Sequence, residues 1–122
     1  MNSPRYLNLL KIKLPIAGIS SITHRISAVG VFLLSFPLLA ILAFSLSSEE
    51  NFLLIASMQS YLISKIILSL FIAGITYHFI SGIRHLVMDF GYWETLKAGR
   101  NSAIGTFILS LLMSLIFIIQ IW

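Results

Sequence analysis

The chain contains no cysteine among its 122 residues. This absence excludes disulfides, thiolate nucleophiles and thiolate-bound iron–sulfur clusters within the chain, so any iron–sulfur chemistry belongs to a partner. Charge is scarce as well, because Asp, Glu, Lys and Arg make up only 10% of the residues, against about 25% in soluble domains. Too few polar side chains remain to cover a soluble core, and we expect most of the surface to face something other than water.

Long apolar runs take the place of the missing charge. Hydrophobic residues form 58% of the chain, and the mean hydropathy is +0.99. A bilayer core about 30 Å thick needs roughly 20 apolar helical residues, which predicts spans over about 22–46, 62–88 and 103–122. The expected fold class is therefore all-α, an integral membrane bundle of three transmembrane helices in one domain, 1–122. Soluble helices are the alternative, but so short a chain leaves nothing to bury them.

The basic residues flank the apolar runs and form no patch, so the net charge of +4 indicates membrane topology and no nucleic-acid partner. The N-terminal segment, up to the uncharged run that begins at Ile26, carries Arg5, Lys11, Lys13 and Arg25. The loop 47–60 contains Glu49 and Glu50 and neither Lys nor Arg, whereas the later loop contains Lys97 and Arg100. Because positive loops stay inside, we predict a cytoplasmic or matrix-side N-terminus and place Trp122 on the opposite face.

His78 is an ionisable side chain within the second apolar run, with His85 seven residues further on and near the same helix face. A charged or polar ring at that depth is costly, so it should face a partner, a cofactor or a water-filled cavity. Imidazole is a common axial ligand of haem iron, and a hydrogen bond to a neighbouring helix is the alternative. Gly74 and Gly82 flank His78 at i−4 and i+4. They suit either a flat macrocycle edge or close helix packing.

A set of polar residues gathers where the first two spans meet the predicted inner membrane edge. Its members are Ser21, His24, Arg25, Arg84, His85 and Asp89. Ser21 and Arg25 are i, i+4 and can project from one helix face. Asp89 lies near a helix C-terminus, where the macrodipole disfavours an anion, so we expect Arg25 or Arg84 to pair with it. Such donors suit the carbonyl oxygens of a quinone, and interfacial anchoring is the alternative.

Two motifs together resemble the cytochrome b556 membrane-anchor subunits of succinate dehydrogenase. They are Ser20-Ser-Ile-Thr-His-Arg-Ile-Ser27 and the segment from His78 through Gly82-Ile-Arg-His-Leu to Asp89-Phe-Gly-Tyr92. The similarity extends over nearly the whole chain. The opening differs, because the usual Arg-Pro-x-Ser/Asn-Pro-like start appears only as a degenerate Ser3-Pro-Arg.

The resemblance implies a set of partners and cofactors. It implies a second small membrane-anchor subunit, an iron–sulfur subunit and a flavoprotein subunit docked on the cytoplasmic or matrix side. It also implies one haem b between the two anchors, with His78 as the axial ligand from this chain. The second ligand would come from the partner anchor. The implied location is the inner (cytoplasmic) membrane, or the mitochondrial inner membrane if the source is eukaryotic.

The resemblance also implies roles for the residues at the inner edge. Ser21 and Arg25 match the ubiquinone site, and His24 matches a histidine near a haem propionate. Asp89 matches an acidic residue near the quinone pocket, and His85 matches a second histidine. The implied activity is transfer of electrons from the iron–sulfur subunit to ubiquinone, with no succinate site in this chain. A fumarate reductase anchor using menaquinone and a non-catalytic structural or assembly protein remain as alternatives.

Overall fold

A computed structural model describes residues 13–122, which form four helices and no strand. The helices are α1 (Ile16–Ser45), α2 (Glu49–Met58), α3 (Leu62–Asp89) and α4 (Leu96–Ile119). Helices α1, α3 and α4 are each long and apolar enough to cross a membrane. The predicted all-α class with three long apolar helices is therefore confirmed. Arg5, Lys11 and the Ser3-Pro-Arg opening lie outside the described residues.

Two helices begin earlier than the apolar runs that predicted them. Helix α1 begins at Ile16 after Pro15, and α4 begins at Leu96, where the Thr95 hydroxyl accepts the Ala98 N–H at 3.2 Å. Hydropathy marks only the part of a helix that suits lipid, whereas backbone hydrogen bonds continue through polar residues at the membrane edge. The helices are for this reason longer than the spans read from apolarity.

Helix α3 ends where Gly91 takes a positive φ of 84°. The Gly91 N–H donates to the Met88 carbonyl at 2.9 Å, and the Tyr92 N–H donates to the Val87 carbonyl at 3.3 Å. These bonds satisfy carbonyls that would otherwise be left unpaired at the end of the helix. The chain can then turn back at once into α4.

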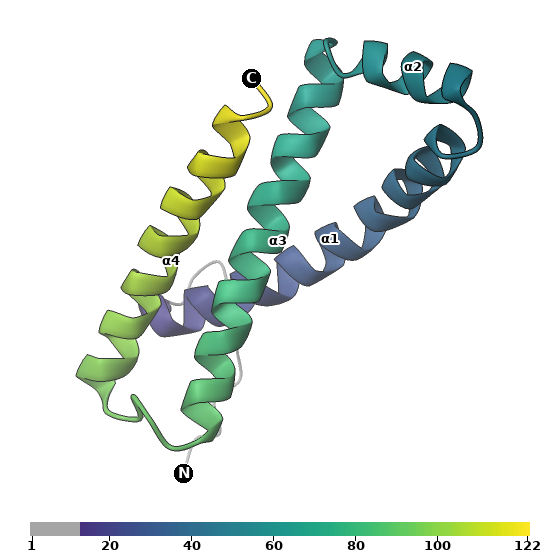
Figure 1. The fold of residues 1–122 in the computed structure, drawn as a ribbon. Coiled ribbons are helices and arrows are strands. Elements are labelled where there is room, and N and C mark those ends of the chain that lie inside the picture. Colours follow the sequence, from purple (N-terminus) through teal and green to yellow (C-terminus); the bar gives the residue numbers. More distant parts are fainter. Residues whose placement is uncertain (1–12) are drawn as a thin grey trace.

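The short helix α2 closes the loop at the opposite end of the molecule. The Ser48 hydroxyl accepts the Asn51 N–H at 3.1 Å. Glu49 and Glu50 occupy the first turn, where the helix dipole stabilises negative charge. Figure 1 shows α2 lying across the gap between the end of α1 and the start of α3.

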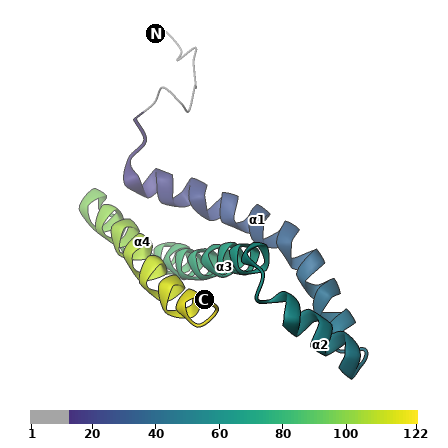
Figure 2. The ribbon, with the colours of Figure 1, turned by 90° about the horizontal axis from the view of Figure 1, so that it is seen from above.

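Helix α3 contacts both other long helices. Helix α4 runs back along it, whereas α1 crosses it obliquely and moves away from it toward α2 (Figure 1). Seen from above, α1 and the C-terminal half of α4 lie on opposite sides of α3 (Figure 2). Near the α2 end, the Trp122 indole donates to the Ser69 hydroxyl at 3.1 Å, and Lys65 donates to the Trp122 main-chain oxygen at 3.3 Å. These bonds hold the end of the described chain against α3.

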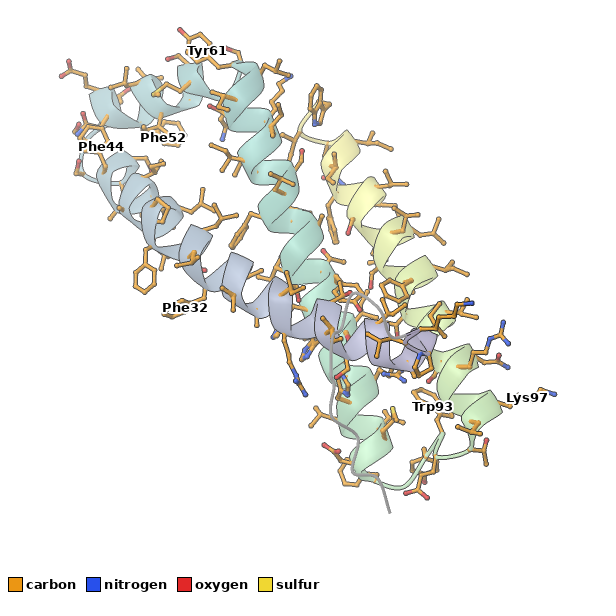
Figure 3. All side chains as sticks on the ribbon, turned by 180° about the vertical axis from the view of Figure 1, so that it is seen from behind. Phe32, Phe44, Phe52, Tyr61, Trp93 and Lys97 are labelled. Atoms are coloured by element: carbon orange, nitrogen blue, oxygen red, sulfur yellow. The ribbon has the colours of Figure 1, made fainter. Side chains whose placement is uncertain are left out.

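The packing is inverted relative to a soluble protein. Large apolar side chains point outward, as Phe32 does in Figure 3. The Phe32 side chain is 61% exposed. The side chains buried between helices are mostly small or polar, and include Ser20, Ser81, Arg84, Ala103, Thr106, Ser110 and Ser114. Since lipid solvates apolar surface, helices in a membrane associate through small residues and interhelical hydrogen bonds. The burial pattern thus supports the membrane assignment independently of hydropathy.

We predict that Ala103→Leu destabilises the packing of α4. Ala103 is 0% exposed, and overfilling a close-packed contact costs about 1–3 kcal/mol. The thermal unfolding midpoint of the detergent-solubilised protein should fall. Gly105→Leu is the matched control on the same helix, because a Cβ at Gly105 meets nothing within 4 Å. Equal losses in the two variants would show that α4 does not pack as described.

Candidate functional site

The crossing of α1 over α3 brings three imidazoles together. The His24 ring stacks on the His78 ring, with centroids 4.2 Å apart and planes 5° from parallel. The His24 and His85 centroids are 5.0 Å apart, with the planes inclined at 50°. All three side chains are half-buried. His78 and His85 share the face of α3 that meets α1, as their spacing predicted, and α1 adds His24 to the cluster.

The hydrogen bonds of His78 determine which ring nitrogen bears its proton. The Ser27 hydroxyl donates to the His24 carbonyl at 2.7 Å. His78 Nδ1 lies 3.3 Å from that same carbonyl and 3.3 Å from Ser27 Oγ. A carbonyl only accepts, and the Ser27 proton is already used, so Nδ1 is the donor in both contacts. In the neutral ring Nε2 then keeps its lone pair, which is the state of a histidine that binds a metal through Nε2.

This arrangement fits a cofactor that takes one ligand from the chain. Within residues 13–122, no group of three or more His, Asp or Glu side chains is arranged to hold a metal ion. A haem iron needs only one axial imidazole from each side, and His78 offers an oriented one.

Of the two glycines beside His78, Gly74 makes room for α1, whereas a Cβ at Gly82 would be in ordinary van der Waals contact. A Cβ at Gly74 would lie 3.2 Å from Val31 Cγ2, and one at Gly82 would lie 3.6 Å from His24 Nε2. At Gly74 the described contacts show close helix packing. His24 Nε2 is itself buried without a hydrogen-bond partner among the described residues.

The predicted quinone residues lie at the same end of the molecule as the three imidazoles. Ser21 and Arg25 lie one turn apart on α1, with Ser21 half-buried and Arg25 exposed. Asp89 is the last residue of α3 and is exposed. An exposed carboxylate is solvated by water at the membrane edge and does not require an ion pair.

Arg84 has a different partner from the one expected. Its guanidinium donates through Nε to Ser102 Oγ at 3.0 Å and through Nη2 to the Gly99 carbonyl at 3.2 Å. The side chain is only 3% exposed. The predicted pairing of Arg84 with Asp89 is therefore wrong, because Arg84 turns toward α4 and supplies donors that join it to α3. An ion pair between Arg25 and Asp89 is likewise not formed among the described residues.

Sequence reasoning missed the roles of two further residues. Tyr77 joins α3 to α1 through its hydroxyl, and Ser27 orients His78. A tyrosine directly before the deep histidine, and a serine three residues after His24, were the available signals. Neither signal specifies a partner more than 50 residues away, because that depends on where α1 crosses α3.

The helices and their buried polar contacts define a multi-pass membrane protein with an imidazole cluster between two of its spans. Comparison with known proteins shows which family the chain belongs to. Residues 1–117 match the family model described as succinate dehydrogenase/fumarate reductase transmembrane subunit. The chain is also 32% identical over 128 residues to the succinate dehydrogenase cytochrome b556 subunit of Coxiella burnetii, with 100% of both chains covered. The chain belongs to this family of transmembrane subunits, as its motifs indicated.

Proposed function

We propose that this protein is the membrane-anchor cytochrome b subunit of a succinate dehydrogenase, where it helps to bind haem b and ubiquinone. Membership of the family and the similarity to a cytochrome b556 subunit support the proposal. The observation that carries it is the orientation of His78, whose Nδ1 donates to Ser27 and to the His24 carbonyl.

His78 would bind the haem iron from this chain, and the second ligand would come from the partner anchor. Bound haem supplies a one-electron carrier within the membrane. Ser27 and the His24 carbonyl hold the His78 ring by its Nδ1–H, which fixes the tautomer and orients the ring. His24 and His85 line the same crossing and would contribute polar N–H groups toward the haem propionates.

Ser21 and Arg25 would bind the quinone at the inner membrane edge. Their side chains lie one turn apart on α1 and supply a hydroxyl and a guanidinium. Arg25 would polarise one quinone carbonyl, and Ser21 would donate a hydrogen bond to it. Reduction to the quinol consumes two electrons and two protons. Asp89 is exposed at the end of α3, so its carboxylate would exchange protons with water, and His24 would help to relay them.

The electrons would come from an iron–sulfur subunit, because this chain has no cysteine with which to hold a cluster. A flavoprotein subunit would oxidise succinate, and a second small anchor would complete the membrane domain. The complex would reside in the inner (cytoplasmic) membrane, or in the mitochondrial inner membrane of a eukaryote, with the N-terminus inside.

A fumarate reductase anchor that uses menaquinol is the second candidate, because the matched family includes both enzymes. The reaction direction depends on the potentials of the quinone and the partner's centres. Comparison of succinate-driven ubiquinone reduction with menaquinol-driven fumarate reduction by the purified complex separates the two. A structural or assembly protein without a cofactor would show neither activity.

We predict that His78→Leu removes or strongly perturbs the b-type band in the reduced-minus-oxidised optical spectrum of the purified complex. The substitution deletes the proposed iron ligand and keeps an apolar side chain in the helix. Phe79→Leu is the control, because Phe79 follows His78 directly and its side chain is 67% exposed. The Phe79 variant should keep the b-type band. A normal spectrum in the His78 variant would reject the ligand assignment.

We predict that Arg25→Ala lowers ubiquinone reduction by roughly 10- to 100-fold, the effect of losing a charged hydrogen-bond donor. Succinate oxidation by a soluble dye should persist, because the dye takes electrons before the quinone site. Lys97→Ala is a suitable control, since Lys97 is also exposed and basic but lies on α4. Retention of full quinone activity by the Arg25 variant would discard its proposed role.

The orientation has a direct test, because the natural chain contains no cysteine. Asn51→Cys lies on α2, and Glu94→Cys lies in the loop between α3 and α4 at the opposite end. We predict that a membrane-impermeant maleimide added to intact spheroplasts labels position 51 and reaches position 94 only after permeabilisation. The reverse pattern would place the N-terminus outside.

A further inference from the structure

Tyr77 makes an interhelical contact that the proposed haem and quinone sites do not use. Its hydroxyl donates to the main-chain carbonyl of Ser20 at 2.9 Å and lies 3.2 Å from Ser20 Oγ. Tyr77 is 8% exposed and Ser20 is 0% exposed. The bond is thus shielded from both lipid and water, where a polar contact is strongest.

The tyrosine ring is held from the other side as well. The Phe107 ring of α4 stacks on the Tyr77 ring, with centroids 5.3 Å apart and planes inclined at 22°. The hydroxyl is therefore presented to α1 by a ring that α4 supports. A rigid aromatic side chain with its one polar atom bonded is well suited to set the distance between helices.

The position of this bond along both helices gives it a functional consequence. On α1, Ser20 directly precedes Ser21, and in an α-helix its carbonyl also accepts the N–H of His24. On α3, Tyr77 directly precedes His78. One hydrogen bond consequently ties the turn that bears the proposed quinone residues to the turn that bears the proposed haem ligand.

Few other bonds hold this end of α1 in place. Apart from the bonds of Tyr77, the side-chain hydrogen bonds that join α1 to α3 within residues 13–122 are those of His78 Nδ1. Toward its other end α1 moves away from α3 (Figure 1). The Tyr77 bonds are therefore the hydrogen bonds closest to the first turns of α1 that join this helix to α3.

We propose that Tyr77 is a positioning residue for the quinone site, holding the Ser20 carbonyl so that Ser21 and Arg25 keep a fixed place relative to His78. The inference rests on the proposed quinone-binding function. Tyr77 itself touches neither quinone nor iron and acts only through the main chain of α1.

The test is Tyr77→Phe in the intact complex, assayed well below its thermal midpoint. We expect the KM for a short-chain ubiquinone to rise roughly three- to tenfold, the effect of one lost hydrogen bond, with kcat changed less. Inhibition by a competitive quinone analogue should weaken in parallel. Haem content and succinate oxidation by a soluble dye should not change.

Two control variants make the result specific. Ser20→Ala removes only the side-chain oxygen and leaves the carbonyl acceptor, so KM should stay unchanged. Tyr61→Phe removes a hydroxyl from a 62% exposed tyrosine at the α2 end (Figure 3) and should also leave KM unchanged. A rise in KM with Ser20→Ala equal to that with Tyr77→Phe would overturn the assignment to the carbonyl.

A lower thermal midpoint for Tyr77→Phe with unaltered KM and inhibitor affinity would reject the positioning role and leave a structural one. The Arg25→Ala variant separates this failure from failure of the proposed function. If Arg25→Ala lowers quinone reduction as predicted while Tyr77→Phe changes no quinone parameter, only the inference about Tyr77 falls. If Arg25→Ala is also silent, the quinone site itself is wrongly placed.

Discussion

The exclusion of water from the membrane is the constraint on which the structure depends. Apolar side chains gain little by meeting one another when lipid solvates them equally well, so small residues and interhelical hydrogen bonds decide how helices associate. In this protein α3 meets α1 through Tyr77 and His78, and meets α4 through Arg84 and the small residues of α4. Two of the residues that join the helices are next in sequence to proposed site residues. Tyr77 precedes the proposed haem ligand His78, and Ser20 precedes the proposed quinone residue Ser21.

This coincidence has a physical origin. Polar side chains are costly in a membrane, and a short chain has few places to put them. Where α1 crosses α3, the serines and the carbonyl of His24 satisfy the polar atoms of Tyr77 and His78. The same contacts leave the Nε2 of His78 with its lone pair. The same set of hydrogen bonds therefore joins α1 to α3 and orients His78 as a proposed haem ligand.

The fold was largely accessible from sequence, whereas the partners of individual side chains were not. Apolar length predicted the long helices. Asp89 was expected to need a cation, but it is exposed, and Arg84 bonds to α4 instead. The sequence offered Arg84 a partner on its own helix, whereas its hydrogen-bond acceptors lie on α4.

By itself, the sequence determined that this chain spans a membrane and which residues are chemically exceptional there. Hydropathy and residue type are properties of single segments, and His78 is unusual in its apolar run whatever surrounds it. Only the tertiary structure decided that His24 stacks on His78, that Ser27 orients it and that Tyr77 holds the Ser20 carbonyl. Those pairings depend on the angle and depth at which α1 crosses α3. Side-chain packing between segments far apart in the sequence determines this crossing.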